Sequence, residues 1–340
     1  MRNLIARKNL LRKLYLSLSA VLLISHGAHA QDKDMQTLKS ETSRSITHDP
    51  NDTIPRDWKT GGLYNLTFNQ AALSNWAAGG DKSSLSLNTM LNLYAFYLKG
   101  KHSWDNSLNL AYGMVNTTSL GMRKSDDQID FVSKYGYDLG KKWYLSTLLN
   151  FRTQFAPGYA YPDNNTRILT SNFLAPAYLV LSEGIDYKPN DNFSFFLSPA
   201  SARWIIVNND SLANAAAYGV DSGKHSRFQF GSYASIGYTA NLSKTAIYKG
   251  RLDLYSDYLH NPQDITLYMT NILAVKVTRI ISINFSLTII YDNDIKSVKS
   301  DGGQGGPLPQ VQEVLGIGMA YKFDNSGRAK RRMAMGKTGG

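Results

Sequence analysis

The stretch ISINFSLTIIYD, residues 281–292, alternates between apolar and polar side chains. The odd positions carry large apolar residues: Ile281, Ile283, Phe285, Leu287, Ile289 and Tyr291. Most even positions carry polar ones: Ser282, Asn284, Ser286, Thr288 and Asp292. Because successive side chains of a β-strand point to opposite faces, this period of two predicts a strand with one apolar and one polar face.

The same period recurs along the chain. It is found in WYLSTLLNFRTQF, residues 143–155, and in residues 85–97. No stretch with the period of a helix competes with it between residues 58 and 323. The sequence therefore predicts an all-β protein.

Alternation fits both a soluble sandwich, with its apolar face inward, and a membrane barrel, with its apolar face outward. The alternating segments are often about 12 to 15 residues long, whereas soluble strands are mostly about five or six. A tilted membrane strand needs about 9–11 residues within the lipid. The 21 tyrosines and other aromatic residues gather near segment ends, as in the girdles of outer-membrane barrels. These features favour the barrel.

The connections between the segments alternate in length. Short links fall at 100–103, 140–142, 189–192, 243–245 and 279–280, and longer polar stretches fall near 74–84, 116–127, 156–172, 208–225, 260–264 and 293–310. This pattern predicts a transmembrane antiparallel β-barrel of the outer-membrane type with about 12 strands. Both chain ends lie on the short-turn side, which we expect to be periplasmic, with the long loops extracellular.

The ends of the chain differ from its body. Residues 1–30 begin with basic residues, continue with an apolar run at 14–24 and end in Ala28-His29-Ala30, which predicts a signal peptide. The polar residues 31–57 predict a disordered periplasmic leader. The barrel is expected over 58–323 and a basic flexible tail over 324–340.

The net charge of +11 resides mostly at these ends. The signal peptide contributes +5 and the tail +4, which leaves +2 for residues 31–323. With so small a positive charge, residues 31–323 lack the basic surface that binds nucleic acid, and no nucleic acid is expected as a partner. The chain has no cysteine, which excludes disulfides and thiolate metal sites.

A run near the first predicted loop is distinctive: Asn69-Gln70 followed by Leu73-Ser74-Asn75-Trp76-Ala77-Ala78-Gly79-Gly80. It resembles the signature of an uncharacterised family of outer-membrane β-barrels of Bacteroidetes-type envelopes, known as domain of unknown function 3078. The resemblance extends over about 58–323 and implies export and an outer-membrane location, without an established activity. The barrel is expected to finish on its terminal aromatic residues, Tyr321 and Phe323, before the tail.

The loop motif itself comprises Asn75, Trp76, Gly79, Gly80 and Asp81. Its glycines permit the positive φ angles that a hairpin reversal needs. The hairpin does not require Trp76. Three roles stay open for this side chain: an anchor at the membrane interface, a plug in the barrel mouth, or a platform for a ligand.

Placing the polar faces inward puts charges of both signs in the lumen. The candidate pore residues are Asp130, Lys134, Arg152, Lys249, Arg251, Asp253 and Lys276, and Asp138, Asp186, Lys188 and Lys322 share the inward face. These charges either brace a closed interior or line a pore that selects solutes. Arg152, Lys249, Arg251 and Asp253 are the candidates for a constriction.

Catalytic signals are weak. Beyond residue 30 the chain has four histidines, at positions 48, 102, 225 and 260, and none forms a His-x-Ser pattern on a predicted strand. The acidic clusters at 125–127 and 292–294 lack the spacing of a calcium loop. We therefore expect no enzyme activity, no metal and no cofactor, with a lipid hydrolase as a distant alternative.

Two functional hypotheses remain. The barrel is either a narrow, porin-like channel for small polar solutes or a non-transporting structural or accessory subunit of an envelope complex. In both cases the expected partners are outer-membrane lipid and the barrel-assembly machinery.

Overall fold

The structure is a computed structural model that describes residues 57–72, 83–162, 166–190, 192–243, 245–278, 281–298 and 304–324. The predicted signal peptide, nearly all of the leader, the loop motif at 75–81 and the tail beyond Asp324 lie outside these ranges. The side chains of Tyr321 and Phe323 also lie outside the description, although their backbone is part of the last strand.

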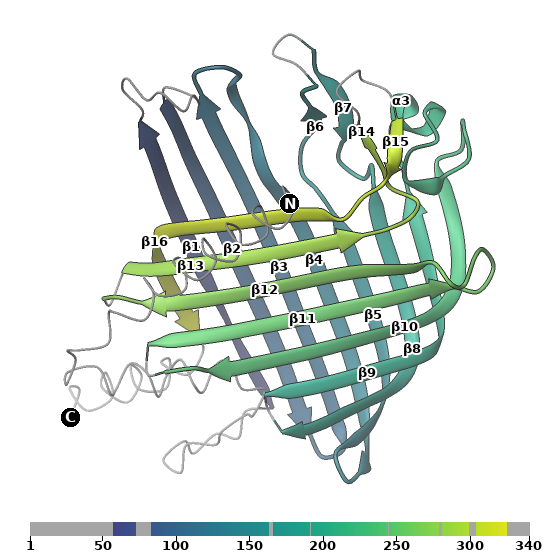
Figure 1. The fold of residues 1–340 in the computed structure, drawn as a ribbon. Helices are drawn as coiled ribbons and strands as arrows, with labels where there is room; N and C mark the ends of the chain where they lie inside the picture. Colours follow the sequence, from purple (N-terminus) through teal and green to yellow (C-terminus); the bar gives the residue numbers. More distant parts are fainter. Residues whose placement is uncertain are drawn as a thin grey trace, which may run out of the picture. The chain divides into compact units, whose positions relative to one another are not determined.

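Twelve antiparallel strands form a closed barrel (Figure 1). They are β1 (Trp58–Ala72), β2 (Ser83–Lys99), β3 (His102–Thr117), β4 (Gly121–Gly140), β5 (Trp143–Thr153), β8 (Ala177–Asn190), β9 (Phe193–Ile206), β10 (Ser226–Asn241), β11 (Ala246–Asp257), β12 (Ile265–Lys276), β13 (Ile281–Tyr291) and β16 (Gln310–Asp324). The first and last strands close the ring, pairing from Gly61 with Asp324 to Phe68 with Ile317. This confirms the predicted fold and strand count.

The remaining elements belong to the longer loops. They are the hairpins β6 (Gly158–Ala160) with β7 (Ile168–Ser171) and β14 (Lys296–Val298) with β15 (Gln304–Pro307), the short helix α3 (Asp210–Asn214) and the 3-10 turn η2 (Ala217–Gly219). Asn209 caps the N-terminus of helix α3, and its side chain accepts a hydrogen bond from the Leu212 amide. Figure 1 shows β6, β7, β14, β15 and α3 together at one end of the barrel. No helix among the described residues is long and apolar enough to cross a membrane.

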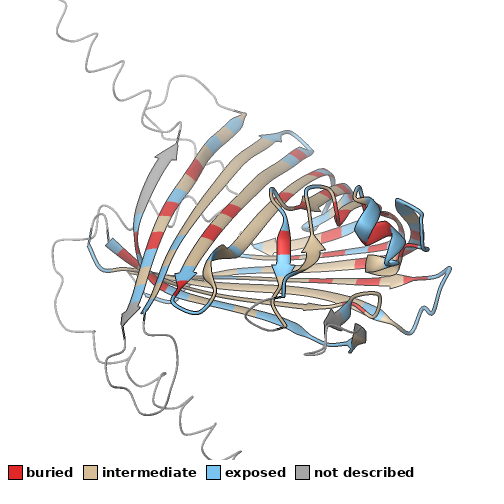
Figure 2. Cartoon of the chain, turned by 90° about the horizontal axis from the view of Figure 1, so that it is seen from above, coloured by how far each residue is buried: buried red, intermediate tan, exposed pale blue. Residues whose placement is uncertain are grey.

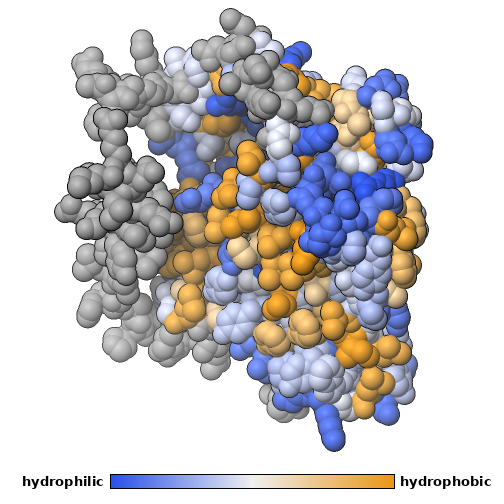
Figure 3. All heavy atoms as spheres, turned by 45° about the vertical axis from the view of Figure 1, so that its right-hand side comes forward, coloured by the Kyte–Doolittle hydropathy of each residue, from blue (hydrophilic) through white to orange (hydrophobic). Residues whose placement is uncertain are grey.

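The strands present apolar residues to the outside. On β16, Val311, Leu315, Ile317 and Met319 are exposed, whereas the intervening Gly316 and Gly318 are buried. Figure 3 shows apolar residues gathered over the strands on one face of the outer surface, and Figure 2 shows buried bands alternating with more exposed residues along individual strands. A closed sheet with an apolar exterior satisfies every backbone hydrogen bond within hydrocarbon. The chain is thus a membrane-spanning barrel of the outer-membrane type.

One predicted loop is much shorter than expected. The polar stretch 116–127 is mostly strand, because β3 continues to Thr117 and β4 begins at Gly121. Only three residues make the turn, and Gly121 has a φ of +65°. The polar residues up to Asp126 remain paired with β3 through a bulge near Gly113. The polar composition of this stretch therefore indicates where the lipid-facing part of β3 and β4 ends. The hydrogen-bonded pairing of the two strands continues beyond that point.

Candidate functional site

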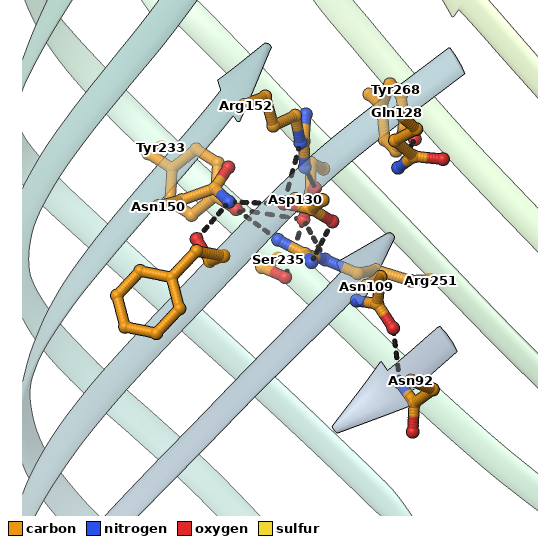
Figure 4. Close-up of polar contacts among 12 residues, drawn as sticks. Asn92, Asn109, Gln128, Asp130, Asn150, Arg152, Tyr233, Ser235, Arg251 and Tyr268 are labelled. Atoms are coloured by element: carbon orange, nitrogen blue, oxygen red, sulfur yellow. Dashed lines mark hydrogen bonds and ion pairs between the residues drawn. The ribbon is translucent and has the colours of Figure 1, made fainter. Parts of the chain in front are cut away.

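Four charged side chains from β4, β5 and β11 meet inside the barrel, and we call them the central cluster: Asp130, Arg152, Arg251 and Asp253. Arg152 Nε lies 3.3 Å from Asp130 Oδ1, and Arg152 Nη2 also pairs with Asp253. Arg251 Nε lies 3.0 Å from Asp253 Oδ1, and its Nη1 lies 3.6 Å from Asp130 Oδ2. Each guanidinium thus contacts both carboxylates, and the cluster has no net charge. Figure 4 shows Arg152 and Arg251 converging on Asp130.

Neutral neighbours complete the hydrogen bonding of the two carboxylates. Asn150 Nδ2 donates to Asp130 Oδ1 at 2.7 Å. The Tyr233 and Ser235 hydroxyls donate to Asp253 Oδ1 at 2.9 and 2.7 Å. Both aspartates are 4% exposed. A carboxylate at this depth is tolerated because it is paired and hydrogen-bonded.

Strand register explains how the cluster forms. Asp130 on β4 pairs directly with Arg152 on β5, and Asp253 on β11 pairs with Ser235 on β10. Directly paired residues share a face of the sheet, so both pairs point inward. β4 and β11 lie five strands apart in the ring, and the two arginines span the space between them. The cluster therefore crosses the lumen instead of lining one wall.

A second contact crosses the lumen at the same level. Gln128 Nε2 on β4 donates to the Tyr268 hydroxyl on β12 at 3.1 Å, and these strands are six apart either way round the ring. The Arg152 guanidinium lies over the Tyr268 ring, 3.9 Å from its centroid, which is a favourable cation–π contact. These contacts and the central cluster together cross the lumen at one level.

On the loop side of the central cluster lies a cavity of about 1020 Å³, which we call the vestibule. Arg152, Asp253, Gln128 and Tyr268 lie among its lining residues at the cluster end. Leu212 of α3 and Tyr218 of η2 line it from the β9–β10 loop. The size and the mixture of aromatic and polar walls are those of a small-molecule site.

The vestibule wall is itself held by ion pairs. Arg203 Nη2 on β9 lies 3.0 Å from Asp292 Oδ2, and its guanidinium lies between the Tyr178 and Tyr255 rings, 4.9 and 5.2 Å from their centroids. Arg227 Nη1 lies 3.0 Å from Asp294 Oδ2 and donates to the Gly219 carbonyl at 2.9 Å. Arg227 of β10 thus connects η2 with the loop after β13.

A further set of ion pairs lies on the short-turn side of the central cluster. Lys134 Nζ lies 2.5 Å from Asp186 Oδ2, and Lys188 Nζ lies 3.3 Å from the same oxygen and 3.1 Å from Asp105 Oδ2. These four residues brace β3, β4 and β8 along one wall. Lys134 thus pairs with Asp186 in this wall network.

The structure divides the candidate pore residues into three groups. It brings Arg152, Arg251, Asp253 and Asp130 together, while Lys134 joins the wall network. Lys249 lies two residues from Arg251 on the same face of β11 and is exposed. Among the described residues it makes no ion pair or hydrogen bond. Lys276, at the end of β12, is half-buried and lies outside the cluster.

Sequence reasoning missed several participants. Asp105, Arg203 and the hydrogen-bonding Tyr233 were not among the candidates, although each lies on the inward face of its strand. The alternation of polar and apolar residues along a strand predicts which side chains face inward. It does not give the register that brings Asp105 to Lys188 or Tyr233 to Asp253.

The described histidines lie away from the central cluster. The ring Nδ1 atoms of His102, His225 and His260 lie 2.6 Å from the Tyr135 hydroxyl, 2.8 Å from the Val207 carbonyl and 3.1 Å from the Asp257 carboxylate, respectively. Within the described ranges, no group of three or more His, Cys, Asp or Glu residues could hold a metal ion.

Fold and site together define a membrane barrel with a polar, ion-paired interior. Residues 68–159 match the family model described as "Protein of unknown function (DUF3078)". This match confirms the family resemblance for that stretch, while the rest of the expected 58–323 lies outside it. Comparison with proteins of curated function finds no match.

Several solved outer-membrane barrels are similar in structure. An outer membrane channel from Pseudomonas putida F1 is 14% identical, with a TM-score of 0.37, and covers 82% of this chain and 100% of its own. The NanC porin is 11% identical, with a TM-score of 0.37, over 77% and 100%. Outer membrane phospholipase A from Escherichia coli is 12% identical, with a TM-score of 0.32, over 82% and 96%. At these values the similarities carry no argument about function.

Proposed function

We propose that the protein is a narrow outer-membrane channel for small polar solutes, with the central cluster at its constriction. The observation that carries the proposal is the vestibule of about 1020 Å³, which ends on the central cluster. A barrel whose only need was mechanical stability would gain by filling this volume with packed side chains. Charged residues at a narrow point inside a water-filled barrel are the usual means of solute selection.

Bracing and selection are compatible in this arrangement. The ion pairs hold opposite walls at a fixed separation, and the same side chains then set the width and charge of the opening beside them. In this proposal the long loops, including those with α3 and η2, face the cell exterior, and both chain ends face the periplasm, as in bacterial barrels generally.

The test is conductance in planar lipid bilayers. We expect purified protein to give discrete steps, and Arg251→Gln to shift the ion preference towards cations because the cluster then carries one net negative charge. Lys141→Gln, in the exposed turn between β4 and β5, is the matched control and should leave the preference unchanged. Membranes that stay silent with folded protein would contradict the channel and favour a non-transporting accessory barrel.

A further inference from the structure

The interior of the barrel is packed unevenly. On β5, β8, β9 and β10 the inward side chains are almost completely buried. Ser146, Asn150, Ser182, Phe196, Ser201 and Tyr233 are each at most 4% exposed. We call this side the packed wall, and only towards the loops do its Asn150 and Tyr233 line the vestibule.

The opposite side retains accessible surface. Thr270 on β12 pairs with Thr288 on β13, which in turn pairs with Gln312 on β16. All three share the inward face of Tyr268 and all are partly exposed. Ser286, two residues from Thr288, is partly exposed as well. We call the inward faces of β12, β13 and β16 the open wall.

β2 contributes to the same space. Asn92 faces inward, because its side chain hydrogen-bonds to Asn109, the direct neighbour of Asp130. Asn92 is partly exposed. Between β2 and β16, β1 is closely packed: Thr67 lies where a Cβ on Gly316 would stand.

The open wall and β2 are nearly free of charge. Their described inward side chains carry hydroxyl, amide and apolar groups, apart from Lys276 at the short-turn end of β12. Lys322 of β16 shares this face near the same end of the barrel, and its side chain lies outside the description. The central cluster next to this space is internally neutralised, since each arginine contacts both aspartates. The Asp126 carboxylate contacts the open wall near the loop end, accepting a hydrogen bond from Gln312 at 3.2 Å. Between this point and Lys276, an ion would lose hydration without meeting an unpaired counter-charge among the described residues, which is costly. A neutral solute could exchange its water hydrogen bonds for side-chain ones at little cost.

We propose that solutes pass along the open wall, beside the central cluster, and that the passage favours small uncharged molecules rich in hydroxyl or amide groups. This inference rests on the proposed channel function and names its solute class. On the turn side the passage emerges near Lys249, whose exposure on an inward face marks open space there. The central cluster then forms one edge of the passage and fixes its width.

The chain has no native cysteine, so single cysteines can be introduced and labelled after folding. We would place Ser286→Cys, on the open wall, in liposomes and treat it with a water-soluble methanethiosulfonate carrying a bulky group. We expect complete labelling and a fall in L-arabinose permeability of about fivefold or more, because the label occupies the passage. Ser146→Cys, on the packed wall, is the matched control and should neither label nor change permeability. Heat-dependent gel mobility would report folding for both.

Unlabelled protein supplies the second readout. L-arabinose should enter liposomes several-fold faster than gluconate or glucosamine, which are of comparable size and carry opposite charges. Failure of Ser286→Cys to label, labelling without a fall in permeability, or faster entry of either charged sugar would overturn the inference while leaving a channel in place. Liposomes impermeable to all three solutes would instead overturn the channel itself and this inference with it.

Discussion

Asp253 is the most heavily used acceptor of the central cluster. Its carboxylate receives hydrogen bonds from Tyr233 and Ser235 and contacts both arginines. The shape of the cluster depends on its negative charge as well as on its hydrogen bonds, since without that charge two guanidinium groups would share Asp130 alone. Replacing Asp253 with asparagine, which has nearly the same shape but no charge, therefore tests the contribution of the charge alone.

Asp253→Asn should lower the free energy of unfolding by about 3 kcal/mol or more, because one partner of a buried ion pair is removed while both cations stay. Urea unfolding in lipid, followed by tryptophan fluorescence, would measure the loss. The matched control is Asp221→Asn, which breaks an exposed pair with Lys224 at 2.9 Å and should leave stability nearly unchanged, because solvent screens such a pair. Equal stability of the two variants would show that the cluster does not brace the barrel.

Gly219 is a position where both the backbone conformation and the surrounding side chains require glycine. Its φ is +72°, and a Cβ would stand 2.5 Å from Arg227 Nη1 and 2.6 Å from Asp294 Cγ. Gly223 in the same loop also has a positive φ, of +77°, but has open space around it, with its nearest neighbour at 3.9 Å. Both glycines avoid backbone strain, and only Gly219 also avoids a clash.

Gly219→Ala should therefore detach η2 from Arg227, whereas Gly223→Ala should cost only the backbone strain of about 1 kcal/mol. Hydrogen exchange of residues 208–225 would report the difference as faster exchange in Gly219→Ala, with the barrel strands unchanged. Similar exchange in both variants would mean that the contact with Arg227 does not hold the loop.

At the scale of elements, the strand faces could be predicted from the sequence because the period of two is local. Ile281 to Tyr291 already display which side faces lipid. The far end of β4 could not be predicted in this way, because a strand that continues beyond the lipid has no apolar stripe to mark it. Register is likewise a property of two strands, so the contacts between Arg152 and Asp253, or Lys188 and Asp105, required the folded ring.

The lipid-facing assignment of β13 makes a direct prediction. Leu287→Arg should lower the free energy of unfolding in lipid by about 2–4 kcal/mol, because the charge faces hydrocarbon. Ser286→Arg, one residue away and facing the lumen, should cost clearly less because its guanidinium reaches water. The same urea titration measures both. Greater damage from Ser286→Arg would reverse the faces and replace the membrane barrel with an inward-facing apolar core.

The β9–β10 loop gives a prediction that depends on pH. The Tyr218 hydroxyl donates to the Thr170 carbonyl on β7, and burial raises the pKa of Tyr218 above its usual value. The docked loop therefore keeps this proton while an undocked loop loses it near the ordinary tyrosine pKa of about 10. Docking should be fully stable below that pH and weaken as the pH rises above it. Proteolysis of the loop should accelerate there in the native protein, and Tyr218→Phe should remove the pH dependence.

At the scale of the whole molecule, the two ends of the barrel differ in construction. One end carries the loops with β6, β7, α3 and η2 over the vestibule, and the other has short turns such as 242–245. The vestibule collects solutes only if the end that carries it faces their source. Outer-membrane barrels generally place their longer loops outside the cell, so the orientation of this chain decides the direction in which the proposed passage is loaded.

Two exposed serines at opposite ends provide the test. Ser222 lies in the β9–β10 loop and Ser243 in the turn between β10 and β11. With Ser222→Cys, intact cells should react with a maleimide on a large polyethylene glycol chain. With Ser243→Cys, they should react only after the outer membrane is permeabilised, because the reagent is too large to traverse the barrel. Reaction of Ser243→Cys alone on intact cells would invert the orientation. The vestibule would then face the periplasm, and the passage would serve export from that space.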